Sequence, residues 1–201
     1  MEKMQKIIYL HKIREGKKTI VLVGKRERLD LFLLARGEIK KKIDLEVVLK
    51  GEESRAEVVV LCRVEGNARV FLNIHLRHKA RNTFGRVVAR AALFDKANLD
   101  LRGMLEVERE AKNSDTYFSA RALKMSAGAM AEIHPLLEIK TDEVKASHGA
   151  TVGEIDSHIL FYLRSRGISA EDAEKMYLSG FFREAAREIS ARDKKIFFQY
   201  A

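Results

Sequence analysis

The stretch Arg69-Val-Phe-Leu-Asn-Ile-His-Leu-Arg77 shows most plainly how this chain folds. Val70, Leu72, Ile74 and Leu76 occupy every second position, and the residues between them are of mixed polarity. Successive side chains of a β-strand point to opposite faces, so these four apolar side chains share one face. The stretch therefore predicts a strand that presents one face to a core.

Short apolar runs of the same kind recur from about residue 7 to about residue 144. The clearest are residues 20–23, 31–34, 43–49, 58–64, 70–76, 87–94, 99–107 and 118–123. Their connections are short and polar and hold no helical pattern long enough for a crossover, which argues against a doubly wound α/β sheet. An antiparallel sandwich and a β-solenoid remain. The absence of the Asn-Gly and Asp-Gly pairs typical of tight hairpins favours the solenoid by a small margin.

The pattern changes after Gly153, where apolar residues take helical spacing. Residues 156–167 are predicted to form a helix, with Asp156 or Ser157 as its N-cap and Gly167 in a left-handed exit. We therefore expect a β core over residues 1–153 and a small helical unit over residues 154–201.

A second helix is predicted to begin at the sequence Ser169-Ala-Glu-Asp172, which resembles a capping box with Asp in place of the usual Glu. Gly180 is expected to break or bend this helix, and residues 181–196 to continue as a third helical stretch. The apolar faces of these helices need a partner, either the chain's own β core or another protein.

The net charge of +9 is concentrated in the first fifty residues, which carry 14 Lys and Arg against 7 Asp and Glu. Such a basic region attracts nucleic acid or another acidic partner. The aromatic residues there are few and do not alternate with the charges as a base-stacking platform requires, so nucleic acid is the second choice. The run Lys40-Lys41-Lys42 is expected to be a solvated turn between strands.

Composition also bears on the compartment. With 46% hydrophobic and 33% charged residues, the chain has the composition of a globular protein. It contains no run of about 18 apolar residues and no signal-peptide pattern, so we expect no membrane partner and a cytosolic location. The one cysteine, Cys62, lies in an apolar run and is expected to be a small buried side chain.

Motifs for catalysis and for metal binding are missing. The sequence has no Gly-x-Ser-x-Gly elbow, no P-loop, no Cys-x-x-Cys pair and no His-Glu-x-x-His pair, so we expect no catalytic residues and no enzymatic activity. His75 and His78 are three residues apart in a strand and turn, which does not place them on one strand face as a metal pair. His134, just before Pro135, is expected in a loop.

The segment from Pro135 to Phe182 carries a family resemblance. It includes Lys145-Ala-Ser-His-Gly-Ala-Thr-Val-Gly153, Leu160-Phe-Tyr-Leu-Arg-Ser-Arg-Gly-Ile168 and Ser179-Gly-Phe181. It closely resembles the C-terminal core of the SufB/SufD family, the scaffold proteins of SUF-type iron–sulfur cluster assembly. The resemblance implies a right-handed parallel β-helix, and so decides between the solenoid and the sandwich.

Within that family, the run around His148 is similar to SufD rather than SufB, which has a glutamate-flanked histidine there. The resemblance implies that His148 lies at an interface with a SufB-like chain and takes part in forming the nascent cluster, as an interface residue or a metal ligand. It also implies that the C-terminal helices bind the ABC-type ATPase SufC. The residues expected to dock this ATPase are Leu160, Tyr162, Arg166, Met176, Phe181 and Phe182.

The chain also departs from the family pattern. The given sequence begins almost at the expected β-helix, so by comparison with the family we expect a short form that lacks the N-terminal region. Many SufD chains have Cys where this one has Ala146, and the position of the SufB interface thiolate falls near Ala120. Asp, Glu and His together can bind iron, but sulfide clusters strongly prefer thiolates.

These departures limit the cofactors and partners that we expect. The chain alone should bind no cofactor, and a transient cluster would be shared with a SufB-like partner. A homodimer would make a poor cluster site. An adaptor that binds the ATPase without holding iron is a further alternative.

Overall fold

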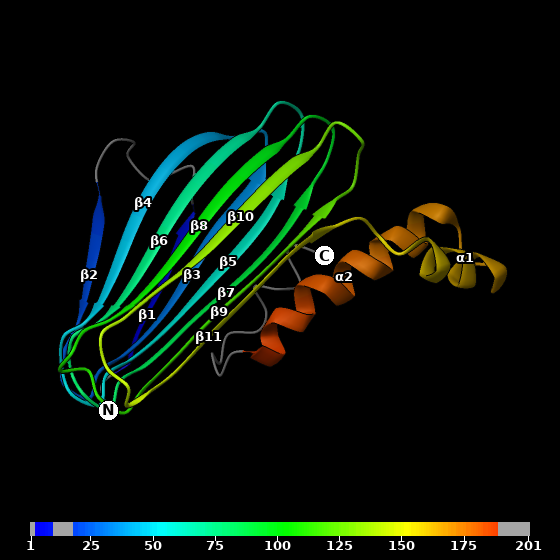
Figure 1. Ribbon diagram of the computed structural model, residues 1–201. Helices are drawn as coiled ribbons and strands as arrows, with labels where there is room; N and C mark the ends of the chain where they lie inside the picture. Colours follow the sequence, from blue (N-terminus) through cyan, green and yellow to red (C-terminus); the bar gives the residue numbers. More distant parts are fainter. Residues whose placement is uncertain (1–2, 10–17, 189–201) are drawn as a thin grey trace.

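The computed structural model describes residues 3–9 and 18–188 of the chain, which form strands that wind into a solenoid, followed by two helices (Figure 1). The strands are β1 (Lys3–Tyr9), β2 (Thr19–Val23), β3 (Arg28–Gly37), β4 (Lys40–Leu49), β5 (Arg55–Val64), β6 (Arg69–His78), β7 (Phe84–Leu93), β8 (Asn98–Val107), β9 (Ser114–Lys124), β10 (Met130–Ile139) and β11 (Val144–Gly153). The helices are α1 (Ser157–Ser165) and α2 (Ala170–Glu188).

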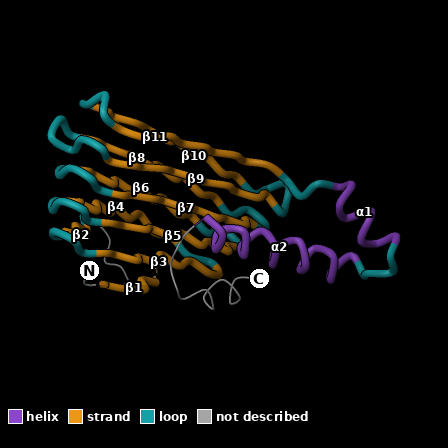
Figure 2. The backbone as a smooth tube through the Cα atoms, turned by 90° about the horizontal axis from the view of Figure 1, so that it is seen from below, coloured by secondary structure: helices purple, strands orange, loops and turns teal. Residues whose placement is uncertain are grey.

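The strands form two parallel sheets. One has the order β1-β3-β5-β7-β9-β11 and the other β10-β8-β6-β4-β2. The sheets contain alternate strands of the sequence, so each coil adds one strand to each sheet, and the coils stack as Figure 2 shows. Every strand pair is parallel, which excludes the antiparallel sandwich and confirms the β-solenoid.

The same corner of successive coils repeats one backbone feature. Arg26, Glu53, Asn82 and Asn113 each lie between a strand of the smaller sheet and the next strand of the larger one. Each has a positive φ, between 57° and 59°. A left-handed residue turns the chain sharply without closing a hairpin. This explains why the sequence shows short connections but no hairpin signature.

The core lies between the inner faces of the two sheets. Val70, Leu72, Ile74 and Leu76 are all buried there, at 3% exposure or less, as the alternation in the sequence predicts. Cys62 is fully buried in the same core, also as predicted, and burial raises the pKa of its thiol to about 12.

A second apolar cluster joins α2 to the outer face of the six-stranded sheet (Figure 1). Side chains of β3, β5, β7 and β9 meet Leu178, Phe181, Phe182 and Ala185 of the helix. The helix therefore covers the flank of the solenoid rather than its end. It is continuous from Ala170 to Glu188, so the expected break at Gly180 is wrong, and residues 189–196 of the expected third helix lie outside the described residues.

The predicted helix caps are confirmed. The Asp156 side chain accepts a hydrogen bond from the backbone N–H of His158 at 2.9 Å, and Gly167 has φ +84°. The Ser169 hydroxyl accepts a hydrogen bond from the backbone N–H of Asp172 at 3.1 Å. Neither described helix is long and apolar enough to cross a membrane.

Two expectations about loops, those for the lysine run 40–42 and for His134, are wrong. The lysine run 40–42 begins β4 and is not a turn. His134 lies within β10, beside Pro135, and His148 lies within β11. These two strands pair with β8 and β9 over their whole length, so backbone hydrogen bonds to the preceding coil order segments that lack strong strand patterns of their own.

Candidate functional site at the open end of the solenoid

The last coil, formed by β10 and β11, leaves one end of the solenoid open (Figure 2). Each strand is the edge of its sheet and is paired on one side only among the described residues. Leu137, Ile139 and Val152 continue the core-facing columns of β8 and β9, yet they are 38%, 38% and 40% exposed. The coil therefore presents core side chains and unpaired backbone groups together, which is a template for another chain.

His148 lies in the middle of this open end. It is in register with Phe118 of β9, which is buried in the core, so the His148 side chain is on the core-facing side of β11. His148 is nevertheless exposed, because no further coil of residues 3–9 and 18–188 covers it. Within residues 3–9 and 18–188, no side chain forms a hydrogen bond or ion pair with His148. An accessible imidazole with no partner is suited to an interface or to a metal.

The side chains of the coil beneath His148 show which position of the core His148 occupies. The ring of Phe118 fills the interior so completely that a Cβ on Gly103 would lie 2.0 Å from it. In the next coil Gly103 is in register with Pro135, and Phe118 with His148. The imidazole thus continues a column that holds the ring of Phe118, opposite the positions of Gly103 and Pro135.

No thiolate of this chain can reach His148. Ala146 is on the same face of β11, and Ala120 is buried in β9 beneath Ala150. Cys62 is in β5, three strands from β11 in the same sheet. With strands about 4.8 Å apart, the separation is about 14 Å along the stack alone. Among the described residues, the core-facing side of the end coil therefore supplies one imidazole, that of His148, and no thiolate.

The two helices present a second apolar surface. Tyr162 and Met176 are 56% and 52% exposed, and Leu160 is half-buried. Arg166 is exposed, and its guanidinium lies 5.3 Å from the centre of the Tyr162 ring. These four residues of the expected docking set remain at the surface.

The other two docking candidates have a different place. Phe181 and Phe182 are 4% and 0% exposed, because they pack against the sheet. We therefore leave them out of the docking surface. The expected docking set omitted Ile159 and Phe161, which are 41% and 73% exposed. A usable signal was the apolar run Ile159-Leu-Phe-Tyr-Leu163, because a helix that is apolar at five consecutive positions cannot bury all of them on one face.

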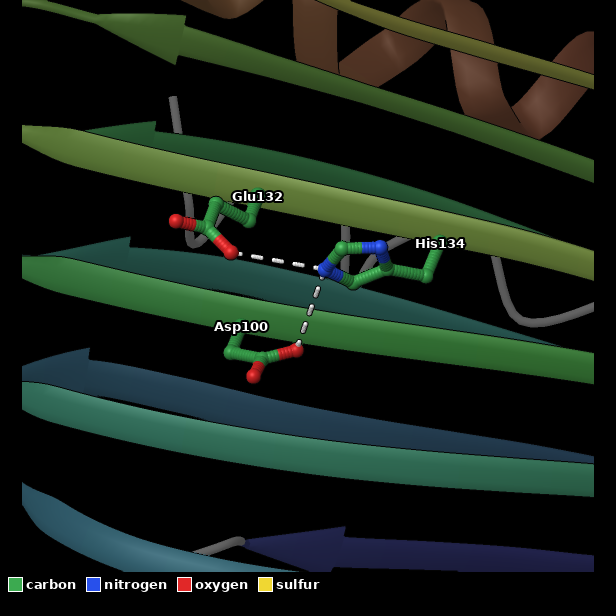
Figure 3. Close-up of side chains that lie close together, drawn as sticks. All are labelled: Asp100, Glu132 and His134. Carbon is green, nitrogen blue, oxygen red and sulfur yellow. Dashed lines mark ion pairs between the residues drawn. The ribbon is translucent and has the colours of Figure 1, made fainter.

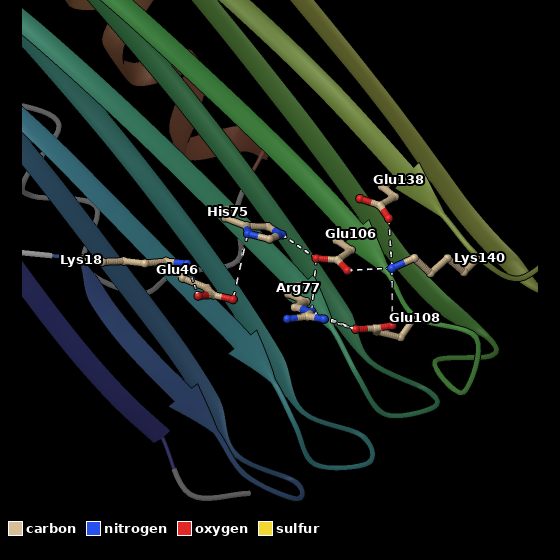
Figure 4. Close-up of polar contacts among 8 residues, drawn as sticks. All are labelled: Lys18, Glu46, His75, Arg77, Glu106, Glu108, Glu138 and Lys140. Atoms are coloured by element: carbon tan, nitrogen blue, oxygen red, sulfur yellow. Dashed lines mark hydrogen bonds and ion pairs between the residues drawn. The ribbon is translucent and has the colours of Figure 1, made fainter.

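A ladder of charged side chains crosses the outer face of the smaller sheet (Figure 4). At its centre, the Glu106 carboxylate lies 2.8 Å from His75 Nε2, 3.2 Å from Arg77 Nε and 3.0 Å from Lys140 Nζ. Hydrogen bonding to Arg77 lowers the pKa of Glu108, and hydrogen bonds to Glu138 and then Glu106 raise the pKa of Lys140. The positive and negative side chains form ion pairs with one another, and these pairs link the neighbouring strands β4, β6, β8 and β10.

A basic groove of about 770 Å³ lies on the same sheet, near the starts of β4, β6 and β8. Lys40, Lys41, Lys42, Arg69 and Lys96 are among the residues that line it. The Lys42 ammonium lies 5.1 Å from the centre of the Phe71 ring, the one aromatic side chain in the lining. The groove can attract an anion, but it offers a single stacking surface.

Comparison with known proteins agrees with this geometry. The family described as "SUF system FeS cluster assembly, SufBD core domain" matches residues 11–181. This chain belongs to the SufBD family. The matched region includes the end coil with His148 and the exposed apolar surface of the two helices.

Individual SufBD proteins are similar over much of this chain. It is 35% identical over 158 residues to the iron–sulfur cluster assembly protein SufD of Escherichia coli, covering 79% of this chain and 37% of that protein. It is 31% identical over 112 residues to SufD of Bacillus subtilis, covering 56% and 26%. A SufBD family protein of Mycobacterium leprae is 26% identical over 174 residues, covering 84% and 20%. The chain thus spans well under half the length of these relatives.

Proposed function

We propose that this chain is a SufD-like scaffold in SUF-type iron–sulfur cluster assembly, without catalytic activity of its own. The observation that carries the proposal is the open end, where exposed core residues, two unpaired strand edges and the unpartnered His148 coincide. Family membership and the similarity to two proteins named SufD agree with it.

The open end would bind a SufB-like chain. Strands of a partner can continue both sheets, and its core residues would cover Leu137, Ile139 and Val152. A second copy of this chain could occupy the same place, but a homodimer would bring together imidazoles without thiolates. Because sulfide clusters prefer thiolate ligands, we assign cluster formation to the heterodimer. The nascent cluster is then cargo shared by His148 and cysteines of the partner.

The surface of Ile159, Phe161, Tyr162 and Met176 would bind a SufC-like ABC ATPase. These side chains are apolar, exposed and close in sequence to the helix that packs on the solenoid. A partner that moves them can therefore transmit motion to the sheet through α2. A free, buried Cys62 suits work in a reducing compartment such as the cytosol.

The test is co-expression with SufB-like and SufC-like chains, followed by affinity purification and anaerobic iron and sulfide analysis. Val152→Lys should release the SufB-like chain and retain the ATPase, since a charge would enter the covered core. Phe161→Asp should do the reverse. Lys50→Ala, an exposed loop change elsewhere, should retain both partners. Retention of both partners by both interface variants would refute the assigned surfaces.

His148→Ala separates the cluster role from assembly. It should retain both partners and lower the iron and sulfide content of the complex by at least about tenfold, as expected for the loss of a ligand. A wild-type cluster content in this variant would refute the role of His148 as a cluster ligand and favour the adaptor alternative.

The basic groove favours nucleic-acid binding as a second candidate function. Affinity that rests on lysines and phosphates falls steeply with salt, because binding releases counterions. An ATPase held by apolar side chains should stay bound at moderate salt. Tight, salt-sensitive binding of an oligonucleotide, lost on Lys42→Glu, would support the second candidate.

A further inference from the structure

Three side chains of metal-binding type converge on the outer face of the smaller sheet, at the end coil (Figure 3). Glu132 and His134 are two residues apart in β10 and so share a face. The pairing of β10 with β8 puts Asp100 directly beside Glu132. The parallel register therefore brings together three residues that are up to 34 positions apart in the sequence.

The distances suit a single ion. His134 Nε2 lies 3.4 Å from Glu132 Oε2 and 3.9 Å from Asp100 Oδ1, and all three ligand atoms are within 4.8 Å of one another. A metal with bonds of about 2.1 Å holds its ligand atoms about 3.0 to 3.4 Å apart, for octahedral and tetrahedral angles respectively. The histidine–glutamate pair already meets this requirement, and the Asp100 carboxylate, 3.9 Å from the imidazole, must move closer to bind the same ion.

The surroundings leave the site accessible. Side chains of Asp100, His134 and Glu132 are 26%, 46% and 64% exposed, so an ion can enter from solvent. Arg102 is the competing cation, with its Nε 3.5 Å from Asp100 Oδ1. Its guanidinium also lies over the Phe71 ring, 5.2 Å from the centre, and can stay there when a metal takes Asp100.

We propose that Asp100, Glu132 and His134 form a binding site for one divalent transition-metal ion. One imidazole and two carboxylates suit Fe²⁺, Mn²⁺, Co²⁺ or Zn²⁺ and lack the thiolates that a sulfide cluster prefers. Three protein ligands leave further coordination positions for water or a small anion. The site is separate from His148, which lies on the other sheet and on its core-facing side. It does not depend on the function proposed above.

Co²⁺ is the probe, because its visible absorption reports the ligands around it. Titration of the metal-free chain at neutral pH should give one bound equivalent, and absorption typical of nitrogen and oxygen ligands. His134→Gln and Glu132→Gln should each weaken this binding by at least about tenfold. Binding should also weaken on acidification, because protons compete for the ligands. His158→Gln, which removes an exposed histidine from α1, should bind Co²⁺ as the wild type does.

Two results would overturn the proposal. One is wild-type Co²⁺ affinity in His134→Gln, which would mean that the three side chains are only an ion-paired cluster. The other is loss of the Co²⁺ signal in His148→Ala with the signal retained in Glu132→Gln, which would assign the metal to the open end. Thermal unfolding of each variant, expected to match the wild type because these side chains are exposed, confirms that the comparison is between folded proteins.

Discussion

At the scale of single residues, His78 is a buried polar side chain that stabilises the fold through a hydrogen bond and stays uncharged. It ends β6, is 0% exposed, and its Nδ1 lies 2.7 Å from the Thr83 hydroxyl. The Thr83 hydroxyl also lies 2.7 Å from the Ser114 hydroxyl, so the three side chains connect neighbouring coils at a corner. Because water is excluded from this corner, burial lowers the pKa of His78 to about 4.

This depressed pKa predicts a pH dependence of stability. Between about pH 6.5 and pH 4 the unfolded chain takes up a proton at His78 and the folded chain does not. The contribution of His78 is therefore complete above pH 6.5 and is lost as the pH falls, by up to about 3 kcal/mol. Urea unfolding of wild type and His78→Leu at several pH values measures the difference. An equal slope of unfolding free energy against pH in the two proteins would contradict the prediction.

At the scale of elements, local hydrogen bonds decide where the helices begin and end, and tertiary packing decides whether a helix continues past a glycine. The caps of α1 and α2 could be predicted, since Asp156, Gly167 and Ser169 act through hydrogen bonds and dihedrals of their immediate neighbours. The effect of Gly180 on α2 could not be predicted from the sequence. The cost of Gly180, about 1 kcal/mol in a helix, is small beside the burial of Phe181 and Phe182 on the sheet, so α2 continues through it.

Gly180, within α2, and Gly167, just after α1, should respond to alanine in opposite directions. Nothing lies within 4 Å of a Cβ added at Gly180, so Gly180→Ala should raise the free energy of unfolding by about 0.5 to 1 kcal/mol. Gly167 has φ +84°, so Gly167→Ala should lower it by about 1 kcal/mol. Urea denaturation measures both. A destabilised Gly180→Ala protein would indicate that α2 is not one helix.

At the scale of the whole molecule, the solenoid is a stack of layers in which large and small side chains face each other across the core. Gly103 and Phe118 are the clearest case, since the ring occupies the space of a missing Cβ. Neither residue is unusual within its own strand, and their strands meet only because every coil keeps its register with the coil beneath. The same regularity leaves the last coil uncovered and brings His148 to the surface.

Gly103→Ala tests this layering. The added methyl would overlap Phe118, and the fold should lose about 1 to 3 kcal/mol. The double variant Gly103→Ala/Phe118→Leu should recover part of that loss, because the smaller side chain frees the space. Gly153→Ala, where nothing lies within 4 Å, should change stability by less than about 0.5 kcal/mol. Failure of the double variant to recover any stability would contradict the layered packing.

The sequence by itself determined the strand pattern of the core, the burial of Cys62, the helix caps and, through the run around His148, the family. These features depend on local periodicity, on hydrogen bonds between residues close in sequence, or on sequence motifs shared with relatives. Tertiary structure alone decided that β10 and β11 are strands, that Phe181 and Phe182 face the sheet, and that Asp100 meets Glu132 and His134. Each of these depends on which coil lies beside which, and parallel register joins residues about thirty positions apart that no local pattern connects.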